Sequence, residues 1–232
     1  MIGIIGAMDI EVASLIDKLS NQKEDVIGGY QFVSGKLHGK DVAVVKSHAG
    51  KVFAAVAACL LITQFHVREV INIGIAGGIS KKIELNLLDI VIAESVVHHD
   101  FDLTAFGNRP GQLSDEFSNR LIRVDQNTCE KLMKAAGTIS QIKATVGVIA
   151  SGDQFIGSEE RSAWIASEFD ADAVDMESAA VGQTCMALGV PFGIVRAISD
   201  KASGSAPGDF EMFCIAAAEN SVKLLSEYIK NC

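Results

Sequence analysis

Carboxylates follow three apolar runs of the chain, each close to the point where the run gives way to more polar residues. Glu11 comes shortly after the run over residues 2–8. Asp175 and Glu177 follow a second run, and Asp200 ends a third. Because the carboxyl ends of neighbouring parallel strands meet at one edge of a sheet, these acids converge if the three runs are neighbouring strands. Two carboxyl groups at such an edge can work as a general acid and a general base.

Asp175 and Glu177 stand where the second run meets a helix rich in small residues. Two positions apart, their side chains point the same way on a strand and diverge once the helix begins. In one interpretation Asp175 caps the helix and Glu177 lies in its first turn, where the helix dipole favours an anion. In the other they belong to a site, and the acids after the other two runs favour this second interpretation.

The bulk composition indicates one compact domain over residues 1–232. With 49% hydrophobic residues, the 232-residue chain can bury a large core without disulfides or metals. The net charge of −9, with no basic run, argues against nucleic acid as a partner, because phosphate binding depends on Lys and Arg. The five cysteines form no CxxC or Cys/His cluster and are expected to be reduced packing residues.

The start of the chain lacks the basic segment of a signal peptide, and no apolar run approaches the roughly 20 residues that cross a bilayer. We therefore expect a cytoplasmic protein without a membrane partner.

Apolar runs and helical patterns alternate along the chain, which predicts an α/β fold with a mixed, mostly parallel sheet covered by helices on both faces. The ligand site of such a sheet lies at the carboxyl ends of its strands. The strand over residues 69–74 is expected to break into a glycine-rich loop over 74–78, where the backbone can approach a ligand closely. Other expected elements are a hairpin over 28–48, a helix over 119–136, a loop over 203–208 and a helix from Asp209.

Four metal-ligating side chains, His98, His99, Asp100 and Asp102, lie within one short segment. Adjacent histidines point apart on a strand, and no second group of ligands supports them elsewhere in the sequence. We therefore expect no metal site, and no sequence pattern calls for a cofactor.

Six motifs, in this order along the chain, resemble those of the 5'-methylthioadenosine/S-adenosylhomocysteine nucleosidases. They are GIIGAMxxE at residues 3–11, the glycines of 74–78, TAFG with GQL within 104–113, SGDxFI at 151–156, DMES at 175–178 and RAISD at 196–200. The resemblance runs from the first residue to the C-terminal helix. It implies a three-layer α/β/α sandwich of the nucleoside phosphorylase-like kind, a homodimer, and irreversible hydrolysis of the N-glycosidic bond of an adenine nucleoside to adenine and a thioribose.

By position, the resemblance implies catalytic roles for Glu11, as the base that activates water, and for Asp200, as the acid that protonates adenine N7. Met176 and Glu177 match the ribose-binding pair. The remaining matches to substrate contacts are Phe155 and Ile156 at the base, Arg196 and Ser199 beside the acids, Met8, Ala49 and Phe210 around the ribose and the 5'-thio group, and Gly77. Leu103 and Phe106 match residues that reach in from the partner subunit.

Two positions depart from the family pattern. Ile75 stands where many members carry a serine, and Ser114 stands where a proline often lines the pocket from the partner subunit. Neither is a catalytic acid, so the expected reaction is unchanged. The preference among methylthioadenosine, S-adenosylhomocysteine, 5'-deoxyadenosine and aminofutalosine stays open.

Two other functions also stay open: a phosphorolytic purine nucleoside phosphorylase of the same fold, and a nucleoside-binding domain without turnover. Phosphorylases that resemble this chain typically carry an arginine where Asn72 stands and a hydroxyl residue where Ile75 stands. The presence of both Glu11 and Asp200 argues against a pure binder, because binding alone requires no carboxylate that faces the anomeric carbon.

Overall fold

The computed structural model describes residues 1–114, 119–202 and 210–232. The expected loop over 203–208 and the expected helix start at Asp209 lie outside these residues. The strands are β1 (Ile2–Gly6), β2 (Ser20–Ile27), β3 (Tyr30–Leu37), β4 (Lys40–Lys46), β5 (Val70–Gly78), β6 (Ile90–His98), β7 (Ile122–Arg123), β8 (Ala144–Ser151), β9 (Ala173–Asp175) and β10 (Phe192–Asp200). The helices are α1 (Asp9–Ile16), α2 (Lys51–Phe65), η1 (Thr104–Phe106), α3 (Gln126–Ala136), α4 (Glu159–Phe169), α5 (Ser178–Leu188) and α6 (Phe210–Lys230).

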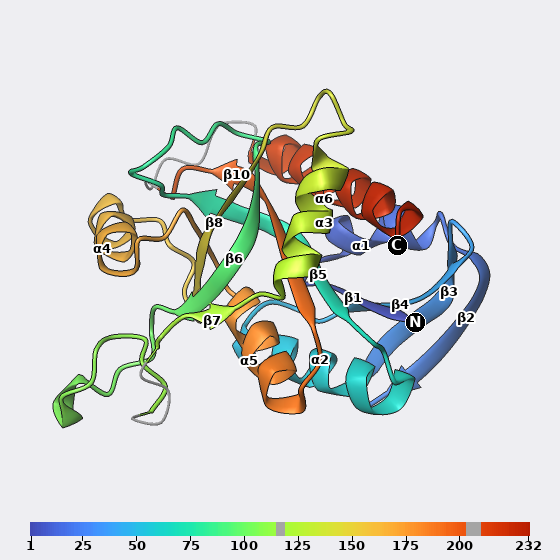
Figure 1. The fold of residues 1–232 in the computed structure, drawn as a ribbon, viewed down its shortest axis with the longest axis horizontal. Helices are drawn as coiled ribbons and strands as arrows, with labels where there is room; N and C mark the ends of the chain where they lie inside the picture. The colour runs from blue at the N-terminus through green and yellow to red at the C-terminus, as the bar shows by residue number, and fades with distance from the viewer. Residues whose placement is uncertain (115–118, 203–209) are drawn as a thin grey trace.

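The strands form one mixed sheet in the order β10-β6-β8-β9-β5-β1-β4-β3-β2, with β7 paired to β6 (Figure 1). β10 also pairs with β5 in parallel, so β5, β9, β8, β6 and β10 close into a ring. β1 pairs in parallel with both β4 and β5. The expected α/β fold with a mixed sheet is confirmed.

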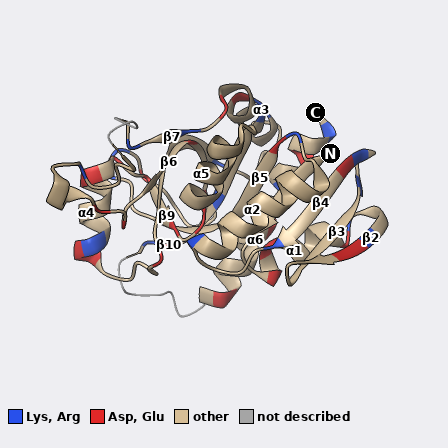
Figure 2. Ribbon diagram, turned by 90° about the horizontal axis from the view of Figure 1, so that it is seen from below, with Lys and Arg blue, Asp and Glu red and all other residues tan. Residues whose placement is uncertain are grey.

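Helices cover both faces of the sheet (Figure 1). On one face α6 packs against both α1 and α3, and on the other face α2 and α5 pack together. Helix α5 carries no charged residue and α2 carries only Lys51, so this second layer is almost free of charge (Figure 2). Within the described ranges, no helix combines the length and apolar character that a membrane crossing requires.

Every residue of β1 and β10 is buried, as expected for strands covered on both faces. The parallel pairings of β1 and β10 with β5 direct the carboxyl ends of all three strands to one edge. Helix α1 begins just after β1 at this edge. Strand β9 runs antiparallel to β5 but pairs with its last residues, Gly77 and Gly78, so α5, which begins just after β9, starts near the same edge. The acids that end the three apolar runs are thereby brought together.

The helix expected over residues 119–136 is shorter in the structure. It begins at Gln126, and the preceding residues form β7, which pairs Arg123 with Ser95 of β6. The side chain of Asp125 accepts a hydrogen bond from Thr128 N at 2.8 Å and so caps the helix at this position. A capping side chain and a short strand pairing therefore outweigh the helical pattern.

The glycine-rich segment 74–78 is also different from the expectation, since it continues β5 instead of forming a loop. Its residues pair with β10 and, at Gly77 and Gly78, with β9. The expected hairpin has a third strand as well, β2, which is largely exposed and polar and therefore carries no apolar alternation that would predict it.

Candidate active site

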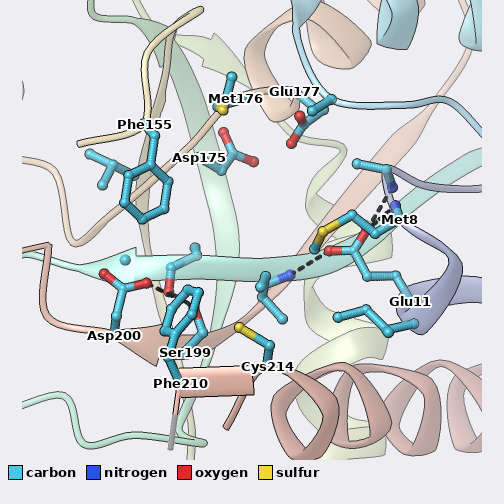
Figure 3. A pocket seen from close by; sticks show the side chains of 17 residues that line it. Met8, Glu11, Phe155, Asp175, Met176, Glu177, Ser199, Asp200, Phe210 and Cys214 are labelled. Atoms are coloured by element: carbon cyan, nitrogen blue, oxygen red, sulfur yellow. Dashed lines mark hydrogen bonds between the residues drawn. The ribbon is translucent and has the colours of Figure 1, made fainter. Parts of the chain in front are cut away.

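A cavity of about 230 Å³ lies at the carboxyl ends of β1, β5, β9 and β10 (Figure 3). The predicted site residues that line it are Met8, Glu11, Ala49, Gly77, Phe155, Met176, Glu177, Ser199, Asp200 and Phe210. Ile156 lines a smaller adjoining space of about 30 Å³, together with Phe155 and Asp200. Residues from separate parts of the sequence are thus gathered around one space large enough for a small molecule.

Glu11 lies in the first turn of α1, and its carboxylate accepts hydrogen bonds from three backbone N–H groups. Oε2 accepts from Ala7 N at 2.6 Å and from Met8 N at 2.9 Å, and Oε1 accepts from Ile75 N at 3.0 Å. Burial raises the pKa of Glu11, whereas nearby Arg196 and these three N–H groups act to lower it. A fixed carboxylate with a raised pKa suits a general base.

Asp200 ends β10 just after an irregularity in the strand. The pairing of β10 with β5 shifts between Ile198 and Asp200, which leaves Ser199 as the extra residue of a bulge. Ser199 and Asp200 both line the cavity, and Ser199 Oγ donates to Asp200 Oδ2 at 2.9 Å. The other carboxyl oxygen, Oδ1, accepts from Ala202 N at 2.8 Å. The bulge therefore directs a held carboxyl group into the cavity.

Glu177 faces the cavity from the start of α5. Its Oε1 accepts from Gly50 N at 2.9 Å, and its Oε2 lies 3.9 Å from Arg196 Nη2. Burial and the negative charge of Asp175 raise the pKa of Glu177 to about 7, although Arg196 acts in the opposite direction. This carboxyl group therefore changes its charge near neutral pH.

Arg196 lies behind the cavity wall and is only 1% exposed. Its Nε donates to Asp175 Oδ2 at 2.7 Å, and its Nη2 donates to Asn72 Oδ1 at 2.6 Å. Burial alone would lower the pKa of Arg196, but the carboxylates of Asp175, Glu177 and Glu11 raise it. The guanidinium stays charged and supplies the positive charge among the buried acids.

Asp175 satisfies both of the interpretations that the sequence allowed. Its carboxylate accepts from Ser178 N at 3.2 Å, as a cap of α5 would, and it also lines the cavity and pairs with Arg196. Ser151 Oγ donates to its Oδ1 at 2.5 Å. Asp175 thus anchors Arg196 while it caps the helix.

Apolar side chains form the rest of the lining. Phe155 is 70% exposed and stands over the end of the cavity that holds Asp200, whereas Met8 lies beside Glu11 (Figure 3). The lining residues that were not among the predicted substrate contacts are Ala7, Ile10, Ile75, Ala76, Val174, Asp175 and Cys214. Cys214, expected as a packing residue, is buried but faces the cavity; no charge or spacing signal in the sequence distinguishes it.

Besides Arg196, which was predicted as a substrate contact but lies behind the wall, three further residues predicted near the pocket do not line the cavity of this chain. Leu103 and Phe106 belong to the η1 segment, in which Phe106 is 82% exposed. Ser114 lies in the segment that follows η1, and its carbonyl oxygen accepts a hydrogen bond from Gln112 Nε2 at 3.3 Å. Their assignment to a partner's pocket stays a prediction.

Three of the four side chains considered for metal binding make other polar contacts, whereas the ring nitrogens of the buried His99 have no hydrogen-bond partner among the described residues. His98 Nε2 lies 2.9 Å from Gln183 Oε1, and Asp100 pairs with Lys51 at 2.6 Å. Asp102 accepts from Thr104 N at 2.7 Å. Within the described ranges, no group of three or more His, Cys, Asp and Glu side chains could hold a metal ion.

Known proteins are similar to this chain in both sequence and fold. The family model of the Phosphorylase superfamily matches residues 1–230. A 5'-methylthioadenosine/S-adenosylhomocysteine nucleosidase from Shewanella denitrificans is 40% identical, with 97% of this chain and 96% of the relative covered.

Two solved structures extend the comparison. The nucleosidase from Neisseria meningitidis in complex with methylthio-immucillin-A is 38% identical with a TM-score of 0.94, and the match covers 100% of this chain and 99% of that one. The nucleosidase from Colwellia psychrerythraea in complex with adenine is 40% identical with a TM-score of 0.92, over 98% and 93% of the two chains. The chain therefore belongs to the phosphorylase superfamily and, within it, to the 5'-methylthioadenosine/S-adenosylhomocysteine nucleosidases.

Proposed function

We propose that this cavity hydrolyses the N-glycosidic bond of 5'-methylthioadenosine and S-adenosylhomocysteine, with release of adenine and the corresponding thioribose. One observation carries the proposal: Glu11 and Asp200 face the same cavity from opposite sides, with Glu177 on a third side (Figure 3). Glycoside hydrolysis requires this arrangement, because the leaving group needs an acid while the attacking water needs a base on the opposite face of the sugar.

The substrate lies with adenine between Asp200 and Phe155, where an aromatic face can stack on the base. The backbone of Ile156 reads the amino edge of adenine. Met176 and Glu177 hold the ribose hydroxyls, since a carboxylate can accept hydrogen bonds from both members of a diol. The 5'-thio group points toward Met8 and Phe210, among the apolar lining.

The reaction proceeds through a ribose ring that carries positive charge. As the bond between C1' and N9 breaks, its electron pair moves onto adenine and Asp200 gives a proton to N7. A water oxygen bonds to C1' while Glu11 takes a proton from that water. Solvent then reprotonates Asp200 and deprotonates Glu11, so no cofactor is consumed.

We also propose turnover of 5'-deoxyadenosine. The 5' end of the cavity is lined by apolar side chains such as Met8, Ile10 and Phe210, which have no donor or charge that would require a sulfur substituent. Loss of the alkylthio group removes apolar contact, so we expect a higher KM than for methylthioadenosine.

Phosphorolysis fits the same cavity poorly. Within the described ranges, no Lys or Arg lines it, and Arg196 is committed to Asp175 and Asn72 behind the wall. A phosphate near C1' would approach the Glu11 carboxylate, and two unit charges about 4 Å apart repel by about 4 kcal/mol at an effective dielectric of 20. Water meets no such repulsion.

We further propose a homodimer in which Leu103 and Phe106 complete the pocket of the partner subunit. Phe106 is 82% exposed, although phenylalanine is among the residues most often fully buried. Helix α2 presents a second set of exposed apolar side chains, with Val52 72% and Phe53 51% exposed. A second copy that covers these surfaces would remove them from water.

We propose a cytoplasmic location as well. All five cysteines are free thiols, which suits a reducing compartment. Cell fractionation tests this location, and recovery of the protein outside the cytoplasm would contradict it.

The activity is tested by incubation of the purified protein with methylthioadenosine, S-adenosylhomocysteine, 5'-deoxyadenosine and aminofutalosine, followed by chromatographic measurement of free adenine. We expect adenine from the first three compounds, and the four rates together give the order of substrate preference. Tight binding without adenine release from any of them would favour a binding domain.

A further inference from the structure

The carboxylate of Glu11 occupies the space that a side chain on Gly74 would fill. A Cβ atom at Gly74 would lie 2.6 Å from Glu11 Oε1, 3.1 Å from Glu11 Cδ and 3.2 Å from Arg196 Nη1. The first of these distances is shorter than carbon and oxygen atoms without a bond between them tolerate. Residue 74 must therefore be glycine if the carboxylate is to stay where it is.

A second glycine borders the same side chain from the neighbouring strand. A Cβ atom at Gly6, the last residue of β1, would lie 3.0 Å from Glu11 Cβ and 2.6 Å from Val12 Cγ1. Strands β1 and β5 are paired in parallel. The Glu11 side chain thus lies over the adjacent strands β1 and β5 at their glycine positions, Gly6 and Gly74.

Space alone explains the glycine at position 74. Its φ is not in the left-handed region, so its backbone conformation suits any L residue. Gly74 also lies inside β5, opposite Arg196 of β10. A glycine in the interior of a strand normally weakens the strand, because it has no side chain to pack. Neither a turn nor backbone strain requires glycine here.

The contacts of Glu11 depend on this close approach. Oε1 accepts from Ile75 N at 3.0 Å, directly after Gly74 in β5, while Oε2 is held by the N–H groups of Ala7 and Met8. A methyl group on residue 74 would push Oε1 away from Ile75 N. The carboxylate would then be held only at its other oxygen.

We propose that Gly74 is a positioning residue for the water-activating base, because its missing side chain provides the space in which the Glu11 carboxylate is held between Ile75 N–H and Arg196. This inference rests on the proposed function of Glu11. It assigns a catalytic purpose to a glycine in a segment that the sequence pattern presents as a ligand loop.

Gly74→Ala is expected to lower kcat by about 10²-fold, the typical cost of a misplacement of about 1 Å at a reacting group. KM should change little, because the predicted base and ribose contacts at Asp200, Phe155 and Glu177 do not touch residue 74. The acid limb of the kcat profile should also move to higher pH, since the Ile75 N–H bond and Arg196 both act to lower the pKa of Glu11. The ionisable groups near Glu11 are Arg196 of β10, behind the cavity wall, and Asp175, Glu177, Asp200 and Cys214, which line the same cavity.

Gly193→Ala is the matched control for a purely structural effect. Gly193 lies in β10, and a Cβ atom there would lie 2.7 Å from Thr128 Cγ2 and 2.9 Å from Ile71 Cδ1, so this substitution also disturbs a buried strand. Residue 193 does not line the cavity. We expect Gly193→Ala to reduce stability while the folded fraction keeps its kcat and its pH profile.

The Glu11→Ala variant, with and without Gly74→Ala, tests this inference separately from the proposed function. In Glu11→Ala the closest contact of a Cβ atom at residue 74 is gone and the 3.2 Å approach to Arg196 Nη1 remains, so adding Gly74→Ala should cost no further activity and little further stability. If Gly74→Ala alone does not fold, refolding in the Glu11→Ala background supports the same steric conflict, and failure there as well contradicts it. Wild-type kcat in Gly74→Ala, or the same loss in Gly193→Ala, overturns the inference. Wild-type activity in Glu11→Ala instead overturns the proposed role of Glu11.

Discussion

At the scale of single residues, Asp200 accepts two hydrogen bonds, and an asparagine can keep both contacts when its oxygen accepts from Ala202 N and its NH₂ group donates to Ser199 Oγ. Ser199 Oγ and Ala202 N both contact its carboxyl oxygens. Asp200→Asn should therefore preserve the fold and the affinity for adenine but lose the proton that N7 receives. We expect kcat to fall by about 10² to 10⁴-fold, the usual contribution of general acid catalysis. Steady-state kinetics and calorimetric titration with adenine check both parts, and a kcat within a few-fold of wild type would remove Asp200 from the acid role.

Glu177→Gln tests the contact to the ribose hydroxyls. A carboxylate accepts more strongly than a neutral amide oxygen, so kcat/KM on methylthioadenosine should fall by roughly 10-fold or more. The 2'-deoxy analogue lacks one of the two hydroxyls and should lose less from the same substitution. Equal losses on the two substrates would show that Glu177 does not hold the 2'-hydroxyl.

The raised pKa of Glu177 also predicts how stability depends on pH. The folded value of about 7 lies above the ordinary value of 4.5, so between these two values the folded state binds more protons than the unfolded state. Stability should therefore decline as pH rises through this window. Urea denaturation at pH 5 and pH 8 measures this decline in the free energy of unfolding. It should be smaller in Glu177→Gln than in the wild type by about 1–3 kcal/mol. An identical decline in both proteins would mean that Glu177 titrates normally.

The sequence predicted the converging acids but not the contacts that hold Arg196. The parallel pairing of β1 and β10 with β5 brings Glu11 and Asp200 together, as the apolar runs predict, whereas β9, which precedes Glu177, pairs with β5 in antiparallel orientation. Asn72, by contrast, is separated from Arg196 by 124 residues and lies within an apolar run, so nothing local marks it as the acceptor of the guanidinium. Register between β5 and β10 decides this contact, and a single sequence does not specify register.

At the scale of elements, Asp100 connects two segments that border the cavity. Its Oδ1 accepts from Lys51 Nζ at 2.6 Å, and its Oδ2 accepts from Asp153 N at 2.9 Å. Asp153 Oδ1 in turn accepts from Lys51 N at 2.8 Å. The start of α2, which supplies Gly50 N to Glu177, is thereby connected to the loop that carries Phe155.

Asp100→Asn should loosen this connection, because the neutral amide forms no ion pair with the Lys51 ammonium. We expect a loss of about 1–3 kcal/mol in stability and a KM raised several-fold, with kcat nearly unchanged. Asp41→Asn, which breaks the exposed pair between Lys36 and Asp41, serves as the control and should leave KM unchanged. A wild-type KM in Asp100→Asn would show that the loop is positioned without this connection.

The elements themselves were partly predictable. The runs that became β1 and β10 are continuously apolar, and such runs identify central strands well. The strand β7 and the late start of α3 depend on Asp125 and on a pairing with β6, and the helical pattern of residues 119–136 conceals both. The glycines of 74–78 predict a loop, whereas in the structure they continue β5, and Gly74 leaves room for Glu11 within the strand.

At the scale of the whole molecule, the proposed dimer predicts a dependence of substrate binding on the partner. Phe106→Ala should raise KM for substrates with bulky 5'-thio groups and change KM for 5'-deoxyadenosine less, because the side chain is expected to reach the 5' end of the partner's pocket. Kinetics with a series of 5'-alkylthio substrates measures this difference. Analytical ultracentrifugation should show a dimer as the active species, and an active monomer would contradict the shared pocket.

The central claim is that water, and not phosphate, attacks C1' in this cavity, and one measurement tests it most directly. Adenine release from methylthioadenosine is followed over a series of phosphate concentrations at constant ionic strength, and the sugar product is analysed by ³¹P NMR. Because Glu11 repels an anion and the described lining offers no Lys or Arg, we predict a rate independent of phosphate, a sugar without phosphate, and a Glu11→Gln variant that phosphate does not rescue. A rate that saturates with phosphate, or a sugar 1-phosphate among the products, would contradict the hydrolytic account.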